Sequence, residues 1–320
     1  MAKIHHHSFW RLLAPQYLLT WPLLFAFLLI SKLPYSAVFY IGRALGKLAY
    51  CFFPKRKYII RTNLSLCFPE KSPTEIEQLL KENLESLCIG ACETALAWFG
   101  PDKTIKIIEN NLVINNEDRL KNALSSGRPV LLITPHASSQ ELLSKIMVKK
   151  YSFTPVFRHL NNPVANYFMQ KARIKIYPNL IQKADTRQIV KALKQKLTIG
   201  ILPDQDFGRR RSVFAEFFGV SAATTTALSK YKKLTNAQIV ALSYVRDKQD
   251  ITKFTVNISE PLDITGYNLE QDARTLNKEL EKIITKDISM YFWVARRFKT
   301  RPLGEEKIYN YQRTMLSYLK

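Results

Sequence analysis

The stretch LLITPHASSQELL, residues 131–143, joins a short apolar run to a segment of helical character, with His136 at the junction. The apolar run over 129–133 has the length and composition of a strand buried inside a sheet. Ser138 or Ser139 is suited to cap the helix that we expect over 139–149. The stretch therefore predicts a strand, a turn and a helix, and it places His136 at the carboxyl end of the strand.

The chain beyond residue 72 repeats this alternation. Ser72 and Glu75 form a capping-box pattern ahead of a helix expected over 73–98. Further helices are expected over 118–124, 163–174, 186–194, 222–234 and 270–288. Further strands are expected over 154–157, 197–202, 238–245 and 253–258, the last of them at a sheet edge. Strands separated by helices predict an α/β fold in which helices cover both faces of a mixed sheet.

The N-terminal region is strongly apolar. Residues 12–31 carry no charge over twenty positions, about the length of a helix that crosses a bilayer. Pro15 and Pro22 argue against a straight span. We predict an N-terminal membrane-anchoring helix, which either crosses the bilayer as a transmembrane helix or lies in one leaflet. A cleaved signal peptide and a buried helical hairpin are the alternative interpretations.

The chain is also strongly basic, with 48 Lys and Arg against 26 Asp and Glu and a formal net charge of +22. Such a charge fits nucleic acid, membrane phosphates or an acidic protein as partner. The first 69 residues hold nine basic and no acidic residues, which favours the cytosolic side of a membrane.

The four cysteines form no CxxC pair, so we expect reduced thiols. We expect an anchor with a basic flank over 1–54 and a single α/β domain over 55–320, whose N-terminal part is helical.

Glu141 follows His136 by five residues. On one ideal helix, residues five apart point about 140° away from each other. The two side chains can meet if His136 ends the strand and Glu141 lies in the first turn of the next helix. A carboxylate on one imidazole nitrogen would then fix the tautomer of a general base. The spacing alone is common by chance, and a histidine with a purely structural role is the alternative.

Several blocks of the sequence resemble one enzyme family. HASSQE is similar to the H-x4-D/E motif of the glycerolipid-type acyltransferases. The chain more closely resembles the late acyltransferases of lipid A biosynthesis, the lauroyl and myristoyl transferases of Gram-negative inner membranes. The blocks that carry this resemblance are RTNLSLCFPEKS (61–72), ESLCIGACETALAWF (85–99), FRHLNNP (157–163), PDQDFGRRRSVFAEFFGVSAATTT (203–226) and YFWVARRFKTRP (291–302).

The resemblance implies a reaction and its partners. A fatty acyl chain would pass from acyl carrier protein to the hydroxyl of a hydroxyacyl chain on a Kdo-bearing lipid A precursor. The fold would resemble that of the glycerolipid acyltransferases, at the bacterial inner membrane with the catalytic domain on the cytosolic side. His136 would take the hydroxyl proton and Glu141 would orient His136. No cofactor, metal ion or nucleic acid is implied.

The resemblance also implies substrate-binding residues. Arg158 would bind a substrate phosphate or the developing negative charge, since guanidinium binds oxyanions in a bidentate fork. Asp204 and Asp206 would position Arg158 or the glycolipid. Phosphates or carboxylates of the glycolipid would be bound by Arg210, Arg296 and Arg297. For each of these last three arginines, a solvated basic face is the alternative.

Two other functions fit parts of the sequence. The charge of +22 would suit a membrane-tethered nucleic-acid-binding protein, although no nucleic-acid-binding module is found. An acyltransferase that acts on a phospholipid or another glycolipid would share the His136 and Glu141 chemistry. The sequence departs from the family at PDQDFGR, where PDHDYGP is commoner, which leaves the lipid and the acyl chain length open.

Overall fold

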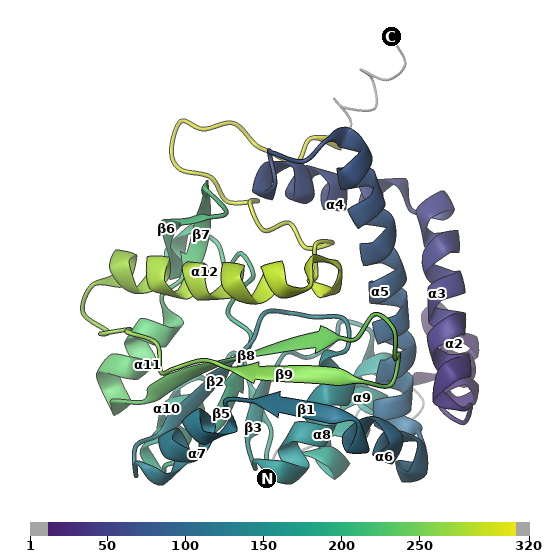
Figure 1. Cartoon of the computed structure of the whole chain (residues 1–320), viewed down its shortest axis with the longest axis horizontal. Helices are drawn as coiled ribbons and strands as arrows, with labels where there is room; N and C mark the ends of the chain where they lie inside the picture. The colour runs from purple at the N-terminus through teal and green to yellow at the C-terminus, as the bar shows by residue number, and fades with distance from the viewer. Residues whose placement is uncertain (1–11, 312–320) are drawn as a thin grey trace.

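The computed structural model describes residues 12–311, and a seven-stranded sheet forms its centre (Figure 1). The strands are β1 (Leu112–Asn115), β2 (Val130–Ile133), β3 (Thr154–Phe157), β4 (Ile181–Gln182), β5 (Ile199–Ile201), β8 (Gln238–Arg246) and β9 (Phe254–Ile258). They follow the order β1-β9-β8-β2-β5-β3-β4. Neighbouring strands are parallel except β8 and β9, which are antiparallel. The predicted mixed sheet is confirmed.

Helices cover both faces of this sheet. The helices beyond residue 72 are α5 (Pro73–Phe99), α6 (Asp102–Asn110), α7 (Glu117–Ser125), α8 (Gln140–Lys150), α9 (Pro163–Ile176), α10 (Thr186–Lys194), α11 (Ala227–Thr235) and α12 (Leu269–Lys286). Leu131 and Ile133 of β2 pack into one apolar core with residues of α10, α11 and α12. Val130 and Leu132 pack into a second core with α7, α8 and α9. All four positions of β2 are therefore buried, as the apolar run predicts.

The described N-terminal part, residues 12–67, consists of helical segments. They are η1 (Pro15–Tyr17), α2 (Thr20–Ile30), α3 (Tyr35–Phe52) and α4 (Pro54–Cys67). Pro22 has no amide hydrogen for the carbonyl four residues earlier, so the uncharged stretch does not form one continuous helix. At 11 residues, α2 is about 16 Å long, against a hydrocarbon layer of about 30 Å. Within residues 12–311, no helix has both the length and the apolar composition to cross a membrane.

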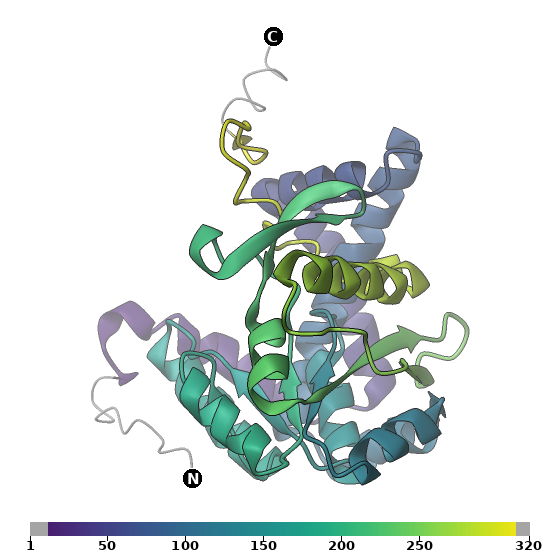
Figure 2. The ribbon, with the colours of Figure 1, turned by 90° about the vertical axis from the view of Figure 1, so that its left-hand side faces the viewer.

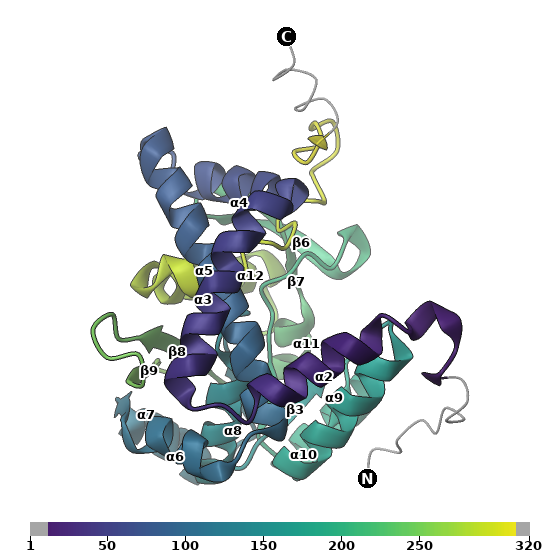
Figure 3. The same cartoon turned by 90° about the vertical axis from the view of Figure 1, so that its right-hand side faces the viewer.

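Helix α3 lies along α5 (Figure 3), and two glycines allow this close packing. A Cβ atom on Gly42 would lie 2.5 Å from the Cα of Ile89, and one on Gly46 would lie 2.3 Å from the Cα of Glu85. Since real Cβ contacts are much longer, a larger residue at either position would separate the helices. Helix α5 begins with the predicted capping box, in which Ser72 and Glu75 bond each other's backbone amides.

Two predicted elements differ in the structure. Residues 222–225 belong to strand β7 (Val220–Thr225) rather than to the start of a helix. This strand pairs antiparallel with β6 (Ser212–Phe217), and Phe218 and Gly219 make the turn with positive φ angles (Figure 2). The strand predicted for a sheet edge, β9, lies inside the sheet, because the unpredicted strand β1 pairs with it. The hairpin β6–β7 forms a separate two-stranded sheet.

Candidate active site

His136 lies beyond the carboxyl end of β2, and Asp204 lies beyond the carboxyl end of β5. The two strands are parallel neighbours, so both side chains reach the same edge of the sheet. The Nδ1 atom of His136 lies 2.5 Å from Oδ1 of Asp204. The carboxylate of Asp204 is 2% exposed, whereas the imidazole is 29% exposed. A hydrogen bond from Nδ1 to the carboxylate leaves Nε2 as the basic nitrogen of a neutral imidazole.

The protonation of Asp204 depends on two opposing effects. Burial by itself raises the pKa of this carboxyl group, because the interior disfavours the charged form. The charge and the hydrogen bond of His136 lower it, and the net result is a pKa below the ordinary value. Asp204 is therefore ionised at neutral pH and stabilises a positive charge on the imidazole ring.

A second segment, far along the chain, holds the loop of His136 in place. The backbone amide of Phe292 donates to the carbonyl of His136 at 3.1 Å. The amide of Ser138 donates to the carbonyl of Met290 at 2.9 Å. Ala137 and Tyr291 form an antiparallel bridge between these two contacts. The geometry here is that of a short strand pair, which fixes the backbone of His136 and so the position of its imidazole ring.

Glu141 lies in the first turn of α8 and turns toward α5 and α9. Its carboxylate accepts hydrogen bonds from Nη2 and Nε of Arg173, the latter at 3.3 Å, and from Nε1 of Trp98 at 3.0 Å. Burial by itself would lower the pKa of Arg173, but the charge of Glu141 raises it. The side chains of the pair are 18% and 16% exposed, so this is a mostly buried ion pair.

The structure differs from the predicted pairing of His136 with Glu141. Asp204, which was expected to position Arg158 or the glycolipid, occupies the Nδ1 side of the imidazole. Among the hydrogen bonds of residues 12–311, those of Glu141 go to Arg173 and Trp98. Glu141 and His136 both line one cavity.

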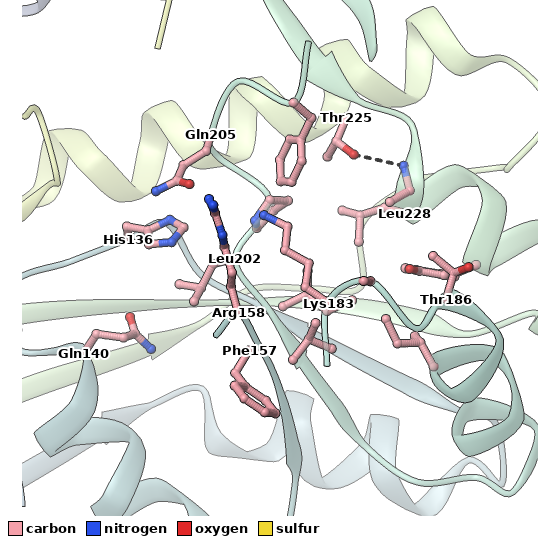
Figure 4. Close-up of a pocket in the computed structure, with 18 of the residues that line it drawn as sticks. His136, Gln140, Phe157, Arg158, Lys183, Thr186, Leu202, Gln205, Thr225 and Leu228 are labelled. Carbon is pink, nitrogen blue, oxygen red and sulfur yellow. Dashed lines mark hydrogen bonds between the residues drawn. The ribbon is translucent and has the colours of Figure 1, made fainter. Parts of the chain in front are cut away.

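This cavity has a volume of about 1350 Å³ and lies over the carboxyl ends of β2, β3 and β5. His136, Glu141 and Arg158 line it, as does Lys183, which follows β4. In the view of Figure 4, the side chain of Arg158 points into the space between His136 and Lys183. Burial lowers the pKa of Lys183, and the nearby cations Arg158 and Arg211 lower it further. Three cations thus crowd one part of the cavity, a setting that favours a bound anion.

The other predicted binding residues do not line the cavity. Asp206 accepts from the amide of Gly208 at 2.8 Å and from the amide and hydroxyl of Thr300, so it ties two loops together. Arg210 and Arg296 are exposed and do not line the cavity. Asp206, Arg210 and Arg296 are therefore not part of the cavity wall, and contact of these residues with the glycolipid stays a prediction.

Arg297 differs most from its predicted role in binding the glycolipid. It is 2% exposed, although it belongs to a basic block that was expected to face the glycolipid. Its Nη1 donates to the carbonyl of Ala223 at 2.7 Å, and its Nη2 donates to the hydroxyl of Thr224 at 3.0 Å. The guanidinium also lies 4.9 Å from the ring centre of Phe217. Arg297 therefore fixes the hairpin β6–β7 from inside the core.

Sequence reasoning missed Trp98, Arg173 and Lys183. Trp98 belongs to the block 85–99, but nothing in its local pattern shows that its indole reaches Glu141. Arg173 lies in the last turn of a predicted helix, where a basic residue is ordinary. Their contacts depend on how helices pack, which local spacing does not encode.

Among residues 12–311, no group of three or more His, Cys, Asp or Glu side chains is placed to hold a metal ion.

The pair of Glu141 and Arg173 leads to a stability prediction. Arg173→Gln lowers the free energy of unfolding by about 3 kcal/mol, because it leaves a mostly buried carboxylate without its cation. Chemical denaturation measures the loss. The matched control is Arg43→Gln, which breaks the more exposed pair of Arg43 and Glu85 and costs about 1 kcal/mol or less. Equal losses in the two variants would contradict the importance of the buried pair.

Comparison with known proteins identifies the family of this chain. Residues 6–300 match the bacterial lipid A biosynthesis acyltransferase family. The lipid A biosynthesis palmitoleoyltransferase of Escherichia coli K12 is 34% identical over 298 residues, which cover 93% of this chain and 96% of that protein. The lipid A biosynthesis lauroyltransferase of the same organism is 34% identical over 299 residues, covering 92% and 95%. The crystal structure of a 1-acyl-sn-glycerophosphate acyltransferase from Thermotoga maritima aligns with a TM-score of 0.36 and 13% identity, over 78% of this chain and 96% of that one. The chain belongs to the bacterial lipid A biosynthesis acyltransferase family.

Proposed function

We propose that this acyltransferase moves a fatty acyl chain from acyl carrier protein to the hydroxyl of a hydroxyacyl chain on a Kdo-bearing lipid A precursor. The observation that carries the proposal is the pair of His136 and Asp204, which opens on a large cavity in a member of this family. The buried carboxylate and the half-exposed imidazole have the arrangement of a general base and its partner.

The reaction needs one proton carrier. Nε2 of His136 accepts the proton of the acceptor hydroxyl while the oxygen attacks the thioester carbonyl. The tetrahedral intermediate then collapses, the carbon–sulfur bond breaks, and the imidazolium gives the proton to the leaving thiolate. An ester and a free thiol are formed without net consumption of a proton. Asp204 stabilises the imidazolium between the two steps.

Cationic side chains of the cavity have a second role. The intermediate carries a negative oxygen, and a cation in a site that excludes water stabilises such an oxygen strongly. Arg158 and Lys183 lie in the cavity beside His136 and are suited either to this oxygen or to a phosphate of the glycolipid. Glu141 does not contact the imidazole ring; with Arg173 it fixes the start of α8 at the cavity wall.

The partners that we propose are all anionic or apolar. Acyl carrier protein, the phosphorylated precursor and the membrane surface would each be attracted by the net charge of +22. The palmitoleoyl and lauroyl transferases named above are equally similar to this chain, so identity does not select an acyl chain length.

We propose that α2 and the outer side of α3 lie in one leaflet of the inner membrane, with the catalytic domain on the cytosolic side. Helix α2 has no charged residue and no buried residue. Leu19, Leu23 and Phe25 are 84%, 71% and 62% exposed. On its inner side, Phe27 of α2 packs against Trp98, which bonds Glu141. An acceptor lipid in that leaflet would therefore lie close to the cavity.

This membrane face gives a binding prediction. Leu19→Ser with Leu23→Ser lowers the affinity for vesicles at least about a hundredfold, since each buried leucine contributes about 1.5–3 kcal/mol. Sedimentation with vesicles of phosphatidylethanolamine and phosphatidylglycerol measures it. Leu303→Ser is the matched control, because Leu303 is 87% exposed but lies in the loop after α12. Equal effects of the two changes would argue against a specific membrane face.

The proposed substrates are tested by pairing donors with acceptors. Purified protein is incubated with acyl carrier protein thioester or acyl-coenzyme A, and with a tetra-acylated Kdo-bearing precursor or a lysophospholipid. We expect the carrier thioester and the Kdo-bearing precursor to give the highest kcat/KM. Transfer to the lysophospholipid alone would replace the acceptor in the proposal, and preference for acyl-coenzyme A would replace the donor.

A further inference from the structure

A buried ion pair lies behind the loop of His136, outside the cavity. Glu93 of α5 is completely buried, and its Oε1 accepts from Nη2 of Arg246 at 2.7 Å. The same oxygen accepts from the hydroxyl of Tyr35 at 2.6 Å, while Oε2 has no hydrogen-bond partner. Arg246 ends β8, and its side chain is 10% exposed. Removing two charges from water is costly, and an apolar pair of similar volume would often stabilise a core as well or better.

The ion pair reaches the catalytic segment through Ser139. Nη2 of Arg246 also donates to Oγ of Ser139 at 2.7 Å. Ser139 lies between His136 and Glu141, directly before α8, and it is 1% exposed. The guanidinium has little freedom, because it lies 4.4 Å from the ring centre of Phe254 and is held by Glu93. A rigid, directional donor thus fixes the point at which the turn becomes helix.

Other contacts along the same face of α5 hold the neighbouring residue. Ser86, Gly90 and Glu93 are spaced by four and three residues, so they share one helix face. The hydroxyls of Ser86 and Ser138 lie 2.8 Å apart. A Cβ atom on Gly90 would lie 2.0 Å from the carbonyl oxygen of Ser138, so the loop rests directly on the helix backbone. One helix face therefore defines the path of residues 138 and 139.

The ion pair also includes the first residue of α3. The hydroxyl of Tyr35 accepts from Nη1 of Arg246 while it donates to Glu93. Burial raises the pKa of Tyr35, and the charge of Glu93 raises it further, so the hydroxyl keeps its proton and remains a donor. Helices α3, α5 and α8 and strand β8 thus meet at one buried cluster of polar groups.

We propose that Glu93 and Arg246 are positioning residues for the acyl transfer, which set the placement of His136 through Ser139 and the turn before α8. They do not touch the substrate. Their role is to hold the turn between the strand and α8 in one conformation, so that His136 stays in place beside Asp204. The inference rests on the proposed function of His136 as general base.

Ser139→Ala tests the proposal with the smallest change, because it removes only the hydrogen bond from Arg246 to the hydroxyl of Ser139. We expect kcat to fall about 10- to 100-fold, since small misplacements of catalytic groups cost this much, while KM stays nearly unchanged. Amide hydrogen exchange over residues 137–142 should become faster. Ser243→Ala is the matched control, a serine of β8 that is also 1% exposed, and it should change neither quantity.

The double variant Glu93→Leu with Arg246→Leu separates positioning from stability. We expect a melting temperature at or above that of the wild type, together with a kcat as low as that of Ser139→Ala. A well-folded double variant with wild-type kcat would overturn the proposal. So would Ser139→Ala with unchanged kcat and unchanged exchange. Amide hydrogen exchange is measured without substrate. If the wild-type protein transferred no acyl chain, the proposed function would be refuted, and the exchange rates of residues 137–142 would still show whether Glu93 and Arg246 hold the turn.

Discussion

His136→Gln abolishes acyl transfer, with a loss in kcat of about 10³-fold or more, and leaves the fold intact. Glutamine keeps an amide that can donate to Asp204, so the buried carboxylate is not left unpaired. It has no nitrogen that accepts a proton near neutral pH, so the hydroxyl of the acceptor stays protonated. Positioned general bases contribute about 10²- to 10⁴-fold to a rate, and here the same group also returns the proton to the thiolate.

The loss is measured as kcat and KM with a carrier thioester, together with the melting temperature. The control is His159→Gln, because His159 is the other histidine within residues 12–311 and does not line the cavity. That variant should keep most of the activity. A His136→Gln enzyme with near-normal kcat would show that another group takes the proton.

Asp204→Asn has the second-largest expected effect, a loss in kcat of about 10²- to 10⁴-fold. The change is nearly isosteric, so the packing behind His136 is preserved. The negative charge that holds the correct tautomer and stabilises the imidazolium is lost. Since Asp204 has a pKa below the ordinary value, the wild-type carboxylate is charged at neutral pH.

Asp206→Asn provides the matched comparison from the same block. Asp206 bonds Gly208 and Thr300 and does not line the cavity. We expect its replacement to lower the melting temperature and to reduce kcat much less than Asp204→Asn does. A greater loss of kcat in Asp206→Asn would contradict the assignment of Asp204 as the partner of His136.

The position of His136 could be predicted, because it depends on the strand and the helix that directly flank it in the sequence. The apolar run over 129–133 and the helix after it place His136 at the end of a buried strand, and this placement is found. The partner of His136 could not be predicted, because Asp204 lies 68 residues further along the chain. The contact exists only because β2 and β5 are neighbours in register, which depends on the packing of the whole sheet.

The basic blocks show a second limit. Arg158 and Arg297 are both arginines in blocks that resemble the family, yet one lines the cavity and the other is buried under β7. Composition cannot distinguish them, because the difference arises from the unpredicted hairpin β6–β7. The polar residues Ser86 and Glu93 were a usable signal, because they lie at helical spacing within the largely apolar second half of α5, and buried polar groups need partners.

The most direct test of the account is tandem mass spectrometry of the lipid formed from carrier thioester and Kdo-bearing precursor. The account predicts one added acyl chain, esterified to the hydroxyl of a hydroxyacyl chain, formed by the wild type and absent with His136→Gln. An acyl chain attached to a sugar hydroxyl or to a phospholipid, or an unchanged yield from His136→Gln, would contradict it.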